Sequence, residues 1–131
     1  MGADGDRRRC LIIEDQALVG MAVESSMEDT GSWTCDLAYS AGHAMRCLED
    51  ADYDAAILDY ILQDKLCTAL AAALSQRGVP FLIYSDYRRP AELPPVLRDA
   101  PWIEKLADHR RVLRAWQEVT ARPATRPAAP L

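Results

Sequence analysis

Asp54-Ala55-Ala56-Ile57-Leu58-Asp59 is an apolar, β-prone run that ends on a carboxylate. Cys10-Leu11-Ile12-Ile13 repeats the pattern and is followed directly by Glu14-Asp15. Short apolar runs of this kind are typical of strands that are buried on both faces of a sheet. The two stretches therefore predict two central strands, each opening onto an acidic edge.

Helical and strand patterns alternate around these runs. A first helix is predicted before Gly31, with a mostly apolar set of residues that recur at helical spacing: Ala17, Leu18, Met21, Ala22 and Ser25. Residues 33–38 fit an edge strand, and Ser40 is placed to cap a second helix. The apolar face of that helix would be Ala41, Ala44, Met45 and Leu48.

The second half of the chain continues the alternation. A third helical stripe stops near Gly78-Val79-Pro80 and comprises Leu66, Leu70, Ala73 and Leu74. Residues 81–84 form a fourth strand, and the four prolines between Ser85 and Trp102 leave room for at most a turn or two of helix. A short fifth strand at 101–104 then precedes a last amphipathic helix, marked by Val112, Leu113, Trp116 and Val119.

Five strands that alternate with helices predict an α/β fold, a parallel sheet covered on both faces. We expect the flavodoxin-like doubly wound (βα)5 arrangement with strand order 2-1-3-4-5 and a shortened or absent fourth helix. The length of 131 residues suits one domain. Residues 9–121 would form it, between a flexible N-terminal segment at 1–8 and a flexible Pro/Ala-rich tail at 122–131.

Composition excludes several classes of function. A formal charge of −5 and a pI near 4.9 argue against binding to nucleic acid, which recruits clustered Lys and Arg. The apolar stretches fall far short of the roughly 20 residues of a membrane span, so we expect a cytoplasmic protein without membrane insertion. The four cysteines form no CxxC pair and predict neither a zinc site nor a redox motif.

The predicted strand order brings three carboxylates together. Strands one and three are neighbours in it, so Glu14, Asp15 and Asp59 meet beyond their carboxyl ends. Such a cluster repels itself unless a cation is bound or pKa values rise, and its hard oxygens favour Mg²⁺. A metal beside a carboxylate makes nucleophilic attack on a phosphoryl group feasible, which makes Asp59 the candidate nucleophile.

Two further residues are predicted at the same edge. Ser85, at the end of strand four, offers a hydroxyl, and Lys105, just past strand five, offers an ammonium to phosphoryl oxygens. The set Glu14-Asp15, Leu58-Asp59, Ser85 and Lys105, in this order after successive strands, resembles the receiver domains of bacterial response regulators. The resemblance covers about residues 9–120 and implies a single-domain phosphoacceptor of two-component signalling.

The resemblance implies a role for each residue of the set. Asp59 would accept a phosphoryl group from a histidine kinase or a histidine phosphotransfer protein. Asp15 would bind Mg²⁺ directly, Glu14 partly through water, and the Ile61 backbone carbonyl would complete the protein ligands. Ser85 and Lys105 would move onto the phosphoryl oxygens, and the aromatic Trp102 would pack inward as part of the switch.

The sequence also departs from the usual receiver pattern. The stretch 79–87 and the prolines after it look like an alphaproteobacterial subgroup with a degenerate fourth helix, but Tyr84 replaces a small residue and Asp86 a glycine. Asp86 would add a carboxylate near the site. Leu106 stands where receivers usually have a proline, and we expect a trans peptide there because a cis bond costs roughly 3 kcal/mol.

Other functions remain open at this stage. The same fold could serve as a degenerate receiver, an interaction or dimerisation module that works without phosphorylation. A phosphatase with an aspartyl-phosphate intermediate usually needs a second acid where this chain has Ile61, so we expect no catalytic turnover beyond self-phosphorylation and self-dephosphorylation. A receiver would act through an unknown downstream protein partner, and the pattern is also compatible with a homodimer.

Overall fold

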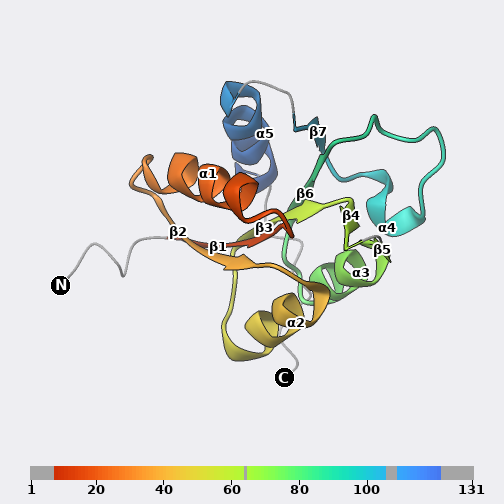
Figure 1. Ribbon diagram of the computed structural model, residues 1–131, viewed down its shortest axis with the longest axis horizontal. Helices are drawn as coiled ribbons and strands as arrows, with labels where there is room; N and C mark the ends of the chain where they lie inside the picture. Colours follow the sequence, from red (N-terminus) through yellow and green to blue (C-terminus); the bar gives the residue numbers. More distant parts are fainter. Residues whose placement is uncertain (1–7, 64, 106–108, 122–131) are drawn as a thin grey trace.

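The computed structural model describes residues 8–63, 65–105 and 109–121, which form a parallel sheet with helices on both faces (Figure 1). The five strands of this sheet stand in the order β2-β1-β3-β6-β7. They span β1 Arg8–Ile13, β2 Trp33–Ala38, β3 Ala55–Asp59, β6 Phe81–Ser85 and β7 Trp102–Glu104. The predicted flavodoxin-like order is confirmed, with β6 and β7 as its fourth and fifth strands.

Helices α1 and α5 cover one face of the sheet, and α2 and α3 cover the other (Figure 1). The helices span α1 Ala17–Glu28, α2 Ala41–Asp50, α3 Thr68–Gln76, α4 Pro95–Arg98 and α5 His109–Ala121. Ser40 caps α2 as predicted, because its Oγ accepts the backbone N–H of His43 at 3.0 Å. Among the described helices, none combines the length and apolar character that a bilayer crossing requires.

Residues that alternate along the central strands supply two separate halves of the core. In β1, Cys10 and Ile12 face the α1/α5 side, and Leu11 and Ile13 face the α2/α3 side. All four are buried to 1% exposure or less, which is why the strand reads as an uninterrupted apolar run. The rigid double core fixes the strand ends that carry the acidic residues.

The prediction for the apolar face of α1 is wrong. The whole predicted stripe points to solvent, including Leu18 at 82% exposure and Met21 at 51%. The helix instead buries Gly20, Val23 and Met27. Gly20 permits a close approach to the sheet, since a Cβ there would lie 3.3 Å from Leu37 Cδ2 and 3.7 Å from the Glu14 Cβ. An apolar, unpartnered helix face is therefore left outside.

The loop after β3 forms a short hairpin that was not predicted. β4 Ile61–Leu62 pairs antiparallel with β5 Lys65–Leu66. Leu66, expected to begin the third helical stripe, lies in β5 with 57% exposure, and α3 begins only at Thr68. Two other members of that stripe, Leu70 and Leu74, are buried in the core as predicted.

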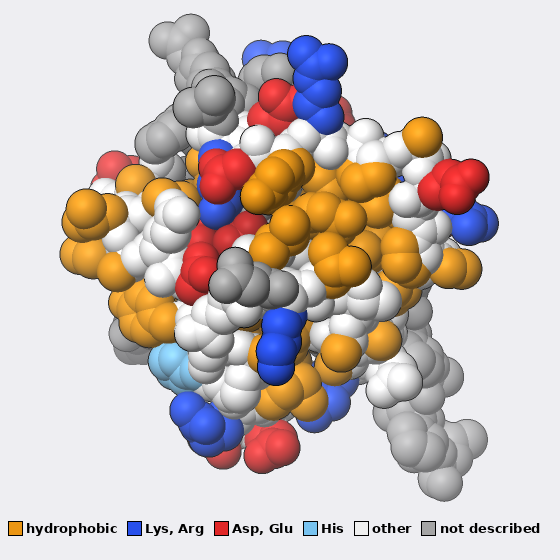
Figure 2. Space-filling model, turned by 45° about the vertical axis from the view of Figure 1, so that its right-hand side comes forward, with side chains coloured by type: hydrophobic (Ala, Val, Ile, Leu, Met, Phe, Trp, Pro, Cys, Tyr) orange, Lys and Arg blue, Asp and Glu red, His pale blue; other side chains and the backbone are white. Residues whose placement is uncertain are grey.

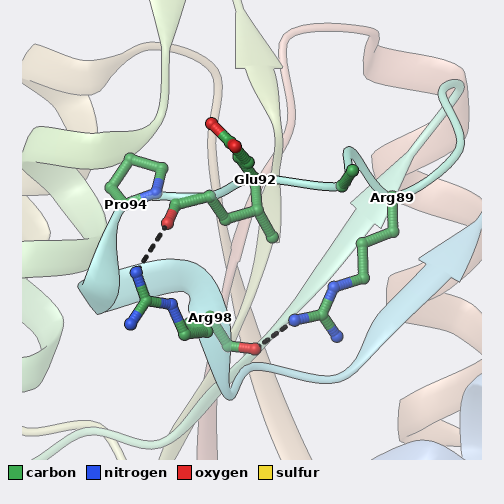
Figure 3. A pocket seen from close by; sticks show the side chains of 6 residues that line it. Arg89, Glu92, Pro94 and Arg98 are labelled. Carbon is green, nitrogen blue, oxygen red and sulfur yellow. Dashed lines mark hydrogen bonds between the residues drawn. The ribbon is translucent and has the colours of Figure 1, made fainter.

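The segment between β6 and β7 holds only the four-residue helix α4, as its prolines predicted. Arginine side chains stabilise this loop: Arg89 donates to the carbonyl of Arg98, and Arg98 donates to the carbonyl of Leu93 at 3.4 Å (Figure 3). They border a pocket of about 580 Å³, which is lined by Arg89, Ala91, Glu92, Leu93, Pro94 and Arg98. None of the predicted site residues lines it.

Some predictions concern the ends of the chain and the loop before α5. β1 begins at Arg8, inside the segment predicted to be flexible. The remaining N-terminal residues, the tail at 122–131 and Leu106 with its peptide bond lie outside the described residues. In α5, Trp116 and Val119 are buried as predicted, and Trp116 packs edge-on against Trp33 with ring centroids 4.8 Å apart.

Candidate functional site

The predicted site residues lie at one edge of the sheet, where its parallel strands end. Glu14 and Asp15 follow β1, Asp59 ends β3, Ser85 ends β6, and Lys105 follows β7. β1 and β3 are paired in parallel register, so the turn after Ile13 stands beside the end of β3. The carboxyl ends of the strands therefore deliver acidic, hydroxyl and ammonium groups to a common edge.

Three carboxylates form a cluster there. Glu14, Asp15 and Asp59 each offer an oxygen, and these oxygens lie within 4.8 Å of one another. Glu14 and Asp59 are buried and Asp15 is partly buried. Hard oxygen donors at this spacing fit a Mg²⁺ ion that keeps some of its waters, because Mg²⁺ uses few carboxylates. The donor set is thus suited to the predicted metal.

Lys105 lies between two of these carboxylates. Its Nζ is 2.5 Å from Glu14 Oε1 in an ion pair, and 3.2 Å from Asp59 Oδ2, to which it donates a hydrogen bond. All three side chains are at most 7% exposed. An ammonium buried with both carboxylates offsets part of their mutual repulsion.

Burial shapes the protonation of the cluster. Desolvation, reinforced by Asp59, raises the pKa of Glu14 to about 7, although Lys105 and the Gln16 N–H act against the rise. Burial also raises the pKa of Asp59, with Lys105 opposing and Asp15 adding to it. The pKa of Lys105 is raised, because attraction to Glu14 and Asp59 outweighs the lowering effect of burial. The cluster therefore holds protons more tightly than separate carboxylates would.

Ser85 is completely buried and is held by its neighbours. Its Oγ accepts the backbone N–H of Tyr87 at 2.9 Å, and its carbonyl accepts the N–H of Lys105 at 2.7 Å. A hydroxyl that accepts one bond keeps its own proton for donation. Ser85 can therefore still donate to an oxygen at this edge.

Trp102 connects two loops of the edge. Its indole N–H donates to the carbonyl of Tyr87 at 2.8 Å, and its ring packs edge-on against Tyr60 with centroids 4.8 Å apart. Tyr60 is the residue after Asp59, and Tyr87 is the residue that bonds to Ser85. Trp102 thus contacts the neighbours of both Asp59 and Ser85.

Comparison by sequence finds no matching family profile and no matching curated protein. Comparison of structures finds many matches. A receiver domain protein (CheY-like) from Methanospirillum hungatei JF-1 is 24% identical, with a TM-score of 0.75 over 88% of this chain and 94% of that one. A two-component response regulator from Clostridium difficile is 18% identical, with a TM-score of 0.77 over 88% and 98%.

This protein has the receiver fold. A third similar structure is the response regulator TrrA from Thermotoga maritima in complex with Mg²⁺-BeF, which is 14% identical. Its TM-score is 0.74 over 86% of this chain and 98% of that one. The resemblance found in the sequence rests on a few site residues in order. The similarity of the structures covers 86% to 88% of the chain.

The departures from the receiver pattern have different outcomes. Asp86 has an exposed side chain and is not among the three carboxylates that cluster in the described residues, so a carboxylate of Asp86 near the site stays a prediction. Tyr84 is buried in the core. Ile61 begins β4 two residues after Asp59, and its carbonyl as a metal ligand stays a prediction. The alphaproteobacterial subgroup also stays a prediction.

Two contacts at the receiver edge were missed by sequence reasoning. The backbone N–H of Gln63 donates to Asp15 Oδ2 at 2.9 Å, and Gln63 itself has a positive φ of 52°. Tyr60 packs on Trp102. No sequence signal identifies a backbone donor in a loop, whereas an aromatic residue directly after the candidate nucleophile could have been noticed.

One surface of the molecule combines acidic and apolar groups. Figure 2 shows acidic side chains gathered in a hollow, with a broad group of hydrophobic side chains beside them. The large exposed apolar residues of the described chain lie largely in elements that follow strand ends: Leu18, Met21, Tyr39, Leu66 and Tyr87. Exposed apolar residues around a polar hollow are typical of a protein-binding surface.

Proposed function

We propose that this protein is a response regulator receiver that accepts a phosphoryl group on Asp59. The donor would be a phosphohistidine on a histidine kinase or a histidine phosphotransfer protein. The protein would then signal through contacts with a downstream partner. The observation that carries the proposal is the Lys105 ammonium between Glu14 and Asp59, beside Asp15, at the carboxyl edge of a receiver sheet.

In the proposed reaction, one carboxylate oxygen of Asp59 attacks the phosphorus atom. The P–N bond to the donor imidazole breaks, and its electron pair leaves with the nitrogen. Glu14, Asp15 and Asp59 would hold Mg²⁺, which when bound neutralises charge on the transferring group. A divalent cation is also what the three carboxylates need, since a single ammonium does not balance them.

Lys105 and Ser85 would stabilise the product. Once Asp59 carries a phosphoryl group, the ammonium that now contacts Asp59 Oδ2 can contact a phosphoryl oxygen instead. The Ser85 hydroxyl proton is free to donate to another. Movement of Ser85 would alter its bond to the Tyr87 N–H and, through the Tyr87 carbonyl, the position of Trp102.

Intact-mass measurement after incubation with acetyl phosphate tests this function. With Mg²⁺ we expect the mass of one added phosphoryl group, and with the ion removed by EDTA we expect none. A protein that gains no mass with acetyl phosphate, and none with a set of phosphorylated donor proteins, would contradict the proposal. It would instead favour the alternative of a degenerate receiver that acts as an interaction module.

The exposed face of α1 supports a prediction about the donor protein. Leu18 lies in the first turn of α1, shortly after Glu14 and Asp15, so a partner seated on this face would also lie over the acidic edge. Leu18→Arg is expected to lower the rate of phosphoryl transfer from a donor protein about tenfold, because it buries a charge in an apolar contact. The rate with acetyl phosphate should stay unchanged, since that donor needs no such surface.

Rapid-quench assays with both donors would measure this difference. Glu49→Arg, on an exposed position of α2 across the sheet, is the matched control and should leave both rates as in the wild type. Equal transfer from the donor protein to the wild type and Leu18→Arg would exclude the α1 face as the donor's docking surface. It would leave the chemistry at Asp59 untouched.

A further inference from the structure

Tyr84 occupies a central position beside the site. Within the sheet it pairs with Asp59 of β3 on one side and Ile103 of β7 on the other. Its side chain is 5% exposed and belongs to the core on the α1/α5 face, together with Ile12 and Ile57. A large phenol is thus buried at the strand end nearest to the acidic cluster.

The Tyr84 hydroxyl has a polar partner at this depth. It donates to the backbone carbonyl of Lys105 at 3.5 Å, a long hydrogen bond. Burial raises the pKa of Tyr84, which Lys105 lowers and Glu14 raises, so the phenol lies within electrostatic reach of both. A buried hydroxyl without a partner would cost free energy, and the contact with Lys105 removes part of that cost.

Lys105 is thereby held at both of its backbone groups. Its N–H donates to the carbonyl of Ser85 at 2.7 Å, and its carbonyl accepts from Tyr84, so two consecutive residues of β6 hold it. These bonds matter because the lysine lies directly after Glu104, the last residue of β7. Leu106 follows it in the sequence, and no proline ring restricts the backbone there.

We propose that Tyr84 is a positioning residue for Lys105: its hydroxyl fixes the lysine backbone so that the ammonium reaches Glu14 and Asp59. The hydroxyl touches neither the phosphoryl group nor its acceptor and acts through Lys105. The geometric part of this inference stands by itself. Only its consequence for phosphorylation rests on the function proposed above.

Tyr84→Phe tests the geometric part, because it removes the hydroxyl and keeps the buried ring. A lysine held in an ion pair shows separate NMR signals for its two ε-methylene protons, and a mobile lysine shows a single averaged signal. We expect separate signals for Lys105 in the wild type and merged signals in Tyr84→Phe. Tyr53→Phe is the matched control, since it removes another buried phenol hydroxyl, which bonds to Asp36 at 2.6 Å.

Separate Lys105 signals that persist in Tyr84→Phe would overturn the proposal, as would merged signals in the Tyr53→Phe control. This readout requires no phosphorylation. It therefore distinguishes failure of the positioning role from failure of the receiver chemistry. If the loss of any buried phenol hydroxyl loosened the whole fold, the Lys105 signals would merge in Tyr53→Phe as well as in Tyr84→Phe, and the proposal would be overturned.

The consequence for chemistry is measured with acetyl phosphate. Tyr84→Phe should slow phosphorylation about twofold, the low end of what one hydrogen bond contributes, because this bond is long. In a Lys105→Ala background the same substitution should cause no further slowing, because the group on which Tyr84 acts is gone. An equal slowing in both backgrounds would show that Tyr84 acts by another route and would overturn the proposal.

Discussion

Asp59→Asn is expected to abolish the phosphoryl adduct completely. The amide keeps the size of the side chain but lacks the anionic oxygen that would attack phosphorus, so no acyl phosphate can form. Asp59 also takes part in the carboxylate cluster and bonds to Lys105, and asparagine preserves an acceptor oxygen for that bond. Intact-mass measurement after acetyl phosphate and Mg²⁺ gives the answer directly.

The control for this variant is another Asp→Asn substitution. Asp50 is exposed at the end of α2, and Asp50→Asn should gain the phosphoryl group as the wild type does. If the same fraction of Asp59→Asn as of the wild type gained a phosphoryl group, the acceptor would be a different residue. Circular dichroism of both variants would show whether the fold is retained.

Glu14 should make the metal-free protein less stable as pH rises. Burial raises its pKa from 4.5 to about 7, so the folded protein keeps this proton to a higher pH than the unfolded chain does. The resulting stabilisation is fully present below pH 4.5 and is lost as pH rises through about 7. A shift of this size corresponds to about 3 kcal/mol in the free energy of unfolding.

Urea unfolding at several pH values, with EDTA present, measures this effect. Glu14→Gln carries no titrating group and should lose much of the decline between pH 4.5 and 7. Glu49→Gln, on the exposed surface of α2, provides the matched control. The same pH dependence in the wild type and Glu14→Gln would show that the buried carboxyl is not its source.

The sheet order and the convergence of the candidate site residues at one edge were predictable for a physical reason. Strand segments buried on both faces are mostly apolar, so Cys10–Ile13 of β1 and Ala55–Leu58 of β3 are conspicuous in sequence. Parallel strands joined by helices have few allowed arrangements, and their carboxyl ends share one edge. Residues at the ends of such strands or directly after them, such as Asp59 and Glu14, can therefore be brought together without coordinates.

The apolar face of α1 could not be predicted by the same logic. Helical spacing identifies residues that share a face, but it does not say which face the sheet covers. Leu18 and Met21 look like core residues, while the helix packs through Gly20, Val23 and Met27. The close approach at Gly20 decides between the two faces, and that contact depends on Leu37 in a different strand.

Loop contacts were beyond sequence reasoning for a different reason. The hairpin of β4 and β5 places Leu66 outside the helix it was expected to begin. Its turn gives Gln63 a positive φ and directs a backbone N–H toward Asp15. Bonds between a side chain and a backbone group across the fold, such as Tyr84 to Lys105, likewise leave no periodic pattern.

The position of Trp102 gives the protein an optical signal of its own. Its indole is partly exposed and bonded to Tyr87, whereas the other two tryptophans, Trp33 and Trp116, are buried together across the sheet. Their ultraviolet emission should be steady, because the two rings pack on each other in the core under α1 and α5, on the face of the sheet opposite Trp102. Changes in emission wavelength or intensity would then come from Trp102, so the proposed phosphorylation of Asp59 would be followed in real time without a label.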